Sequence, residues 1–96
     1  MENRLMVQEG NLLAVFNSTH RVMKAENVLK SLELPVLLIP APRQLMTDCG
    51  LAIRFAEKDR ENIVAVMERE HLLPEYITRF EAGKYVTIWT HETASN

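Results

Sequence analysis

The sequence predicts a single α+β domain, and three observations support this prediction. The chain has 96 residues, of which 47% are hydrophobic and 25% charged, which suits one small core and excludes a cleft between two large catalytic domains. Short apolar runs bounded by proline, glycine and polar residues predict strands. Two segments with apolar residues at three- and four-residue spacing predict helices between those strands.

The first half of the chain predicts strand, helix and strand. The unbroken apolar run 12–16 predicts a central strand, and the following residues 17–19 can each cap a helix. The next segment places four apolar residues on one helical face, namely Val22, Ala25, Leu29 and Leu32. Pro35 forbids continuation of the helix, and 36–39 is predicted as a second strand that ends before Pro40.

The second half of the chain predicts strand, helix and two further strands. Apolar and other residues alternate over 51–55, which predicts a half-buried strand. Asp59 is the expected cap of a second helix whose apolar stripe holds Ile63, Val66 and Met67. The segments 76–80 and 85–89 predict strands, joined by a hairpin turn at 81–84.

This order predicts a ferredoxin-like βαββαβ sandwich with an additional C-terminal strand. Right-handed crossover makes the first two strands parallel, with the third between them and antiparallel to both. We expect a weakly held N-terminal leader over 1–10, a single ferredoxin-like domain over 11–91 and a C-terminal tail over 92–96. The loops that follow the first strand, the second strand and the second helix should all fall at one end of the sheet.

Composition excludes several classes of function. The net charge is −2 with the signs interspersed, which argues against nucleic-acid binding. No apolar run approaches the ~20 residues that span a bilayer, and the first residues lack the apolar segment of a signal peptide. We therefore expect a cytoplasmic protein with no membrane partner. One cysteine and three separated histidines predict no internal disulfide, no metal site and no cofactor.

The lone cysteine, Cys49, is the candidate reactive group. A helix N-terminus carries about half a positive charge and unpaired amides, so it attracts anions. If the sulfur lies beside the start of the first helix, the thiolate is favoured, although the neighbouring Asp48 opposes this. We expect Arg43 to stabilise the thiolate or persulfide, and an anion-binding group formed by Ser18, Thr19, His20 and Gly50.

The chemistry of one sulfur leaves several options open. It can be a nucleophile in acyl or sulfur transfer, sense oxidants through sulfenic acid, or carry a sulfane sulfur as a persulfide. A carrier needs one exposed thiol and no second cysteine on the same chain, because a second thiol would discharge the persulfide as a disulfide. The sequence meets the second condition.

Three segments, Val15–His20, Val36–Arg43 and Cys49–Phe55, resemble in order and spacing a family of small bacterial selenium/sulfur carrier-like proteins. The resemblance covers about residues 11–73, and its specific part is the proline–arginine loop followed by Cys-Gly. It implies that Cys49 accepts sulfur or selenium from a donor, such as a cysteine desulfurase, and passes it to an acceptor protein. The family's loop arginine falls on Arg43, and its helix-start Ser-Thr falls on Ser18 and Thr19.

The resemblance favours a non-enzymatic carrier, and two other readings stay open. One is a small regulatory or anion-binding module in which Cys49 is inert. The other is a structural interaction domain that pairs through the open face of its sheet. The longer C-terminus is compatible with a homodimer, and the sequence does not separate sulfur from selenium.

Overall fold

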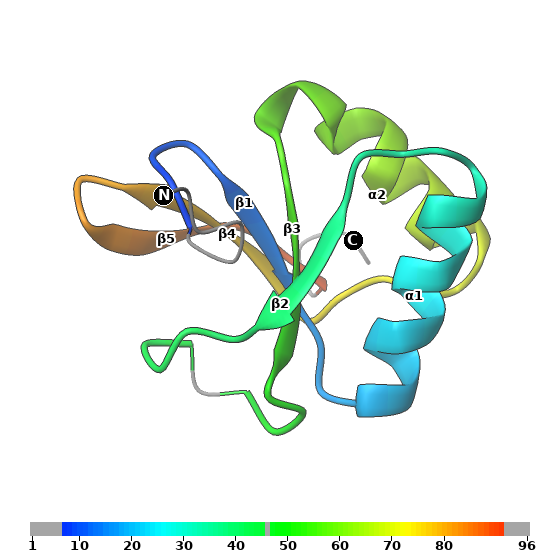
Figure 1. Ribbon diagram of the computed structural model, residues 1–96, viewed down its shortest axis with the longest axis horizontal. Helices are drawn as coiled ribbons and strands as arrows, with labels where there is room; N and C mark the ends of the chain where they lie inside the picture. Colours follow the sequence, from blue (N-terminus) through cyan, green and yellow to red (C-terminus); the bar gives the residue numbers. More distant parts are fainter. Residues whose placement is uncertain (1–6, 46, 92–96) are drawn as a thin grey trace, which may run out of the picture.

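The computed structural model describes residues 7–45 and 47–91 and shows an α+β fold with both helices on one side of a five-stranded antiparallel sheet (Figure 1). The predicted α+β class is confirmed, with two helices and a five-stranded antiparallel sheet. In chain order the elements are β1 (Leu12–Val15), α1 (Thr19–Ser31), β2 (Leu37–Pro40), β3 (Leu51–Phe55), the 3₁₀ turn η1 (Glu57–Asp59), α2 (Arg60–Arg69), β4 (Tyr76–Glu81) and β5 (Lys84–Thr90).

The sheet has the strand order β2-β3-β1-β4-β5. The central strand β1 is antiparallel to both β3 and β4, and β2 is antiparallel to β3. Strands β1 and β2 are therefore parallel to each other with β3 between them, as predicted. Of the two C-terminal strands, β4 pairs with β1, while β5 pairs with β4 at the edge of the sheet.

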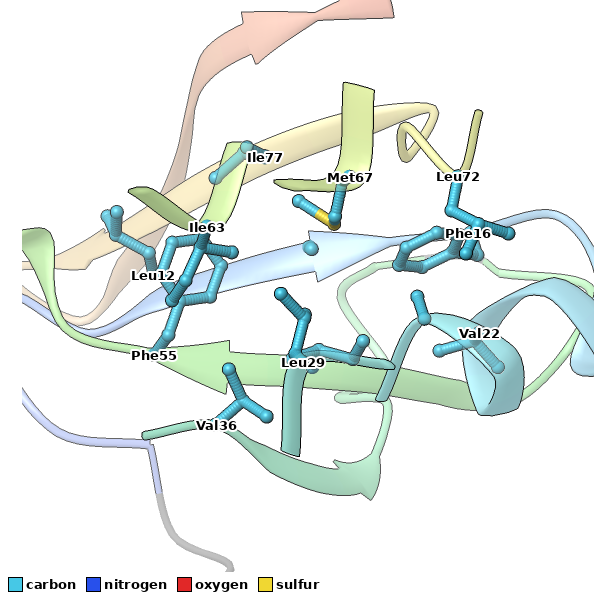
Figure 2. Close-up of a cluster of buried hydrophobic side chains, with 13 residues drawn as sticks. Leu12, Phe16, Val22, Leu29, Val36, Phe55, Ile63, Met67, Leu72 and Ile77 are labelled. Carbon is cyan, nitrogen blue, oxygen red and sulfur yellow. The ribbon is translucent and has the colours of Figure 1, made fainter. Parts of the chain in front are cut away.

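The main core lies between the sheet and the helices (Figure 2). Strand residues that face the helices alternate along the chain, as the pleat requires. Val22 and Leu29 of α1 and Ile63 and Met67 of α2 point toward these strands (Figure 2), and each is at most 1% exposed. The predicted apolar face of α1 is thus confirmed except for Leu32, which is 48% exposed because the helix ends at Ser31.

The face of the sheet opposite the helices is also apolar at its centre. A second cluster consists of Leu13, Val15, Ile39, Leu45 and Ala52. The prediction of a half-buried β3 is therefore wrong at Ala52, which is fully buried beneath a residue of the β2–β3 loop.

The described part of the leader is held against the sheet. Val7 packs against the second cluster, and the Gly10 N–H donates to the Phe80 carbonyl at 2.7 Å. The carboxylate of Glu9 accepts a hydrogen bond from the Ala82 N–H at 3.1 Å. Residues 7–10 therefore contact the sheet, and the rest of the predicted leader and the predicted tail at 92–96 lie outside the described residues.

Two local predictions at chain reversals have different outcomes. The hairpin between β4 and β5 is confirmed as a two-residue turn, in which Ala82 and Gly83 both have positive φ (52° and 77°). Asp59 does occupy the N-cap position of α2, but its side chain makes no capping hydrogen bond. The preceding 3₁₀ turn sets Asp59 at φ −101° and ψ 2°, whereas a capping residue is normally extended.

Candidate functional site

Three segments converge at one end of the sheet, the lower end in Figure 1, as the sequence predicts. The Glu75 N–H donates to the Val15 carbonyl at 2.8 Å, which joins the α2–β4 connection to the end of β1. The guanidinium of Arg21, in the first turn of α1, donates to the carbonyls of His71 (3.3 Å) and Leu73 (3.0 Å). The β2–β3 loop reaches the same place through the sulfur of Cys49.

Cys49 is half-buried, and its sulfur lies among oxygen atoms. Its Sγ is 3.3 Å from the Phe16 carbonyl oxygen, 3.2 Å from the Leu51 carbonyl oxygen and 3.7 Å from Thr47 Oγ1. A carbonyl oxygen accepts the S–H hydrogen but has nothing to donate to a thiolate. The two backbone carbonyls are therefore placed to accept the S–H hydrogen.

The loop around the sulfur is fixed by its own hydrogen bonds. Thr47 Oγ1 accepts from the Gly50 N–H at 2.8 Å, and the Ala41 N–H donates to the Gly50 carbonyl at 2.9 Å. Gly50 has φ +72°, and a Cβ there would meet nothing within 4 Å. The glycine is therefore required by its left-handed backbone and not by a close contact. Its N–H is already bonded, so it is not free for an anion while the bond to Thr47 persists.

The start of α1 contains three of the predicted anion-binding residues. Ser18 is the N-cap, with an extended backbone (φ −145°, ψ 128°), and its Oγ accepts from the Arg21 N–H at 3.3 Å. Thr19 and His20 follow in the first turn and are exposed, and helix geometry leaves their amides without an intrahelical acceptor. Within the described residues, no hydrogen bond links this turn to the Cys49 sulfur.

Arg43, the predicted stabiliser of the sulfur, lies in the β2–β3 loop. Its side chain is exposed and, within the part of the chain that the structure describes, makes no hydrogen bond or ion pair, either with Asp48 or with the Cys49 loop. Its guanidinium is therefore available but not positioned.

Sequence reasoning missed two residues of this end. The Thr47 hydroxyl accepts a hydrogen bond from Gly50 and so stabilises the turn between them. A hydroxyl residue three positions before a glycine is the sequence pattern that could have indicated this turn. Arg21 joins α1 to the α2–β4 connection through carbonyls that lie 50 and 52 residues away. No local pattern reveals such a contact.

A cavity of about 980 Å³ lies on the face of the sheet opposite the helices. We call it the sheet groove; it is lined by the end of β1, the β2–β3 loop and the β4–β5 hairpin, including Leu45, Tyr76, Thr78, Lys84, Tyr85 and Thr87. Burial raises the pKa of both Tyr76 and Tyr85 above the ordinary value, so these phenols stay neutral. Thr78 is 1% exposed, and its hydroxyl has no hydrogen-bond partner among the described residues.

Residues 11–79 match the family described as "Putative Se/S carrier protein-like", and the chain belongs to this family. The resemblance that the sequence suggested is thereby confirmed. No curated protein and no solved structure matches the chain. Among the residues that the structure describes, no helix is long and apolar enough to cross a bilayer, and no three His, Cys, Asp or Glu side chains are grouped to hold a metal ion.

Proposed function

We propose that the protein carries sulfur or selenium as a persulfide or selenopersulfide on Cys49. The observation that carries the proposal is the position of the chain's one cysteine, partly buried at the end of the sheet where three segments converge. Membership of the carrier-like family supports it. The strand order β2-β3-β1-β4-β5, with both helices on one face, supports a ferredoxin-like framework extended by β5.

The proposed chemistry consists of two balanced exchanges. The Cys49 thiolate attacks the terminal sulfur of a donor persulfide; the new Sγ–S bond forms as the donor S–S bond breaks, and the donor leaves as a thiolate. An acceptor thiolate then attacks the terminal sulfur on Cys49, and the Sγ–S bond breaks to restore the Cys49 thiolate. Neither step needs an external oxidant or reductant. A selenopersulfide follows the same course.

The carbonyl oxygens around Cys49 favour a persulfide over a bare thiolate. In a thiolate, the negative charge would sit on Sγ, within 3.3 Å of two carbonyl oxygens. In a persulfide anion, the charge lies mainly on the terminal sulfur, which is a bond length of about 2 Å further out. Loading therefore relieves the repulsion that the unloaded thiolate meets.

Positive groups for the outer sulfur are available nearby in the chain. The first-turn amides of Thr19 and His20 provide donors at the start of α1. The exposed guanidinium of Arg43, which has no partner among the described residues, provides a positive charge on the Cys49 loop. We expect these groups to contact the terminal sulfur after loading, and a cysteine desulfurase or a selenium donor enzyme to supply it.

Intact mass spectrometry tests the proposal. The full chain is incubated with a cysteine desulfurase and cysteine, and wild type is expected to gain whole sulfur atoms while Cys49→Ser does not. Circular dichroism of Cys49→Ser verifies that the variant is folded. An unchanged wild-type mass, beside an active desulfurase, would overturn the carrier.

One observation favours a second candidate, in which Cys49 is structural. Its S–H joins the β2–β3 loop to β1 through the Phe16 carbonyl, as an inert buried thiol would. The domain would then bind an anion or a protein partner. An anion that raises the melting temperature of wild type and Cys49→Ser equally indicates the first role, and melting that depends on protein concentration in both indicates the second.

A further inference from the structure

We propose that the sheet groove binds an extended peptide segment of the sulfur donor, the segment that presents the donor's cysteine to Cys49. This inference rests on the proposed function and assigns to it a partner surface. The position of the groove, its size and the charges at its two ends support this assignment.

One end of the groove adjoins the sulfur. Phe16, Thr47 and Asp48 line it. The Phe16 carbonyl oxygen lies 3.3 Å from Cys49 Sγ, Thr47 Oγ1 lies 3.7 Å from it, and Asp48 is the preceding residue. Cys49 itself is not among the described lining residues and packs against the core on the helix side of the sheet. A chain lying in the groove therefore ends beside residues that contact the sulfur, and its own sulfur would reach Sγ around the end of the sheet.

The groove has the dimensions of a peptide site. It extends along β4 and β5 from Tyr76 to Lys84 at the hairpin, and the six residues of β4 span about 20 Å at the usual rise of a strand. A volume of about 980 Å³ stands at the upper end of the ~300–1,000 Å³ typical of ligand sites. Free cysteine or hydrosulfide would leave most of this space unfilled, whereas an extended segment of about six residues matches its length.

The lining suits a polypeptide backbone. Leu45 and Val15 supply apolar surface, and the neutral phenols of Tyr76 and Tyr85 can each donate and accept a hydrogen bond. Buried hydroxyls are normally paired, so the unpartnered hydroxyl of Thr78 is an exception at the floor of the groove. This oxygen is buried, so a peptide on the floor of the groove reaches it only where the lining residues shift.

The two ends of the groove carry opposite charges. Asp48 and Glu75 are exposed at the end beside the sulfur, and Lys84 is exposed at the hairpin end. His91 also lies at the sulfur end, where its backbone N–H donates to the Glu75 carbonyl at 3.0 Å. Charge complementarity therefore calls for a cation next to the donor cysteine and a carboxylate about five residues further along.

Sulfur transfer explains why an extended segment is needed. Cys49 is partly buried, and the two reacting sulfurs must approach to about 3–3.5 Å. A narrow extended chain is suited to bring a sulfur to that distance at the end of the sheet. The exchange itself is the balanced first step proposed above.

Amide chemical shifts of the full-length Cys49→Ser variant at pH 8, under reducing conditions, test the inference. The matched probe is the synthetic peptide acetyl-Cys-Lys-Val-Thr-Val-Glu-amide, and the swapped probe exchanges its Lys and Glu. We expect the matched peptide to bind more tightly and to shift residues 76–90 and 47–50. Lys84→Glu should weaken the matched peptide by about two- to fivefold and strengthen the swapped one, as an exposed ion pair does. Lys24→Glu, an equally exposed change on α1, should alter neither affinity.

Several outcomes would overturn the groove site. Millimolar peptide could cause no chemical-shift changes, or changes confined to other elements. The two peptides could also bind with equal affinities that Lys84→Glu leaves unchanged. Shifts that follow protein concentration without peptide would also overturn it, because they would make a second copy of the chain the occupant. The variant lacks the sulfur, so binding is measured independently of loading. Sulfur loading without peptide binding overturns the groove alone, and peptide binding without sulfur loading overturns the carrier.

Discussion

Replacing Thr78 by valine should stabilise the protein, although it removes a polar group from a buried strand. The side chain is 1% exposed on the central part of β4, and its hydroxyl has no hydrogen-bond partner among the described residues. Leaving a buried hydroxyl unpaired costs about 1–3 kcal/mol, and valine has nearly the same shape. We expect Thr78→Val to raise the free energy of unfolding by about 1 kcal/mol, which for a domain of this size raises Tm by about 4–8 °C.

Urea denaturation followed by circular dichroism measures this effect. The midpoint should rise while the slope m stays unchanged, because the surface exposed on unfolding is the same. Thr87, the residue opposite Thr78 on β5, is exposed and supplies the control: Thr87→Val should change stability by no more than about 0.5 kcal/mol. A loss of stability in Thr78→Val that is absent from Thr87→Val would mean that the hydroxyl is satisfied in solution, and the reasoning would be wrong.

Three further changes test other parts of the fold. Gly50→Ala should cost about 1–2 kcal/mol, measured by urea denaturation, because an L side chain is strained at φ +72°; an unchanged midpoint would contradict the fixed loop. Met67→Ala should cost about 2–5 kcal/mol by the same measurement, whereas Met23→Ala, at a side chain 51% exposed, should cost far less; equal losses would contradict the core assignment. The hydrogen bond from Arg79 lowers the pKa of Glu57, so this carboxylate stabilises the fold above its ordinary pKa of 4.5, and that contribution is lost as pH falls through the lowered value. As the pH is lowered from 6 to 3, the urea midpoint should therefore fall less in Glu57→Gln than in wild type. If the two plots of midpoint against pH are parallel, the stabilising Glu57–Arg79 ion pair is contradicted.

The predictions that succeeded rest on local physics. The apolar run at 12–16 could be buried on both faces only in the middle of a sheet, and β1 is the central strand. Ser18 caps α1 because its hydroxyl reaches an amide three residues ahead. The two-residue turn at Ala82 and Gly83 follows from the geometry of tight hairpins.

The features that sequence reasoning missed depend on contacts between distant segments. Leu45 covers Ala52 on the second face only because the β2–β3 loop folds back over the sheet, and no periodicity in the loop indicates this. Leu32 continues the apolar period of α1, but the helix ends one residue earlier, so the side chain is exposed. The Arg21 guanidinium donates to the carbonyls of His71 and Leu73, which lie nearby only because of the fold topology.

The candidate site shows the same division. The sequence could identify Cys49 as the one thiol and place it in the loop that meets the end of β1. It could not show that two carbonyl oxygens are the nearest partners of the sulfur, because backbone acceptors leave no trace in residue types. Nor could it show that the Arg43 side chain is exposed and makes no hydrogen bond or ion pair within the described part of the chain.

A complete cycle of loading and release is the most direct test of whether Cys49 carries sulfur. The protein is loaded by a desulfurase, separated from it, and mixed with an acceptor thiol while its intact mass is followed with time. We predict that the added sulfur lies on Cys49, that it is transferred to the acceptor, and that the unmodified chain can be loaded again. An adduct that persists with excess acceptor, or sulfur that appears equally on Cys49→Ser, would contradict it.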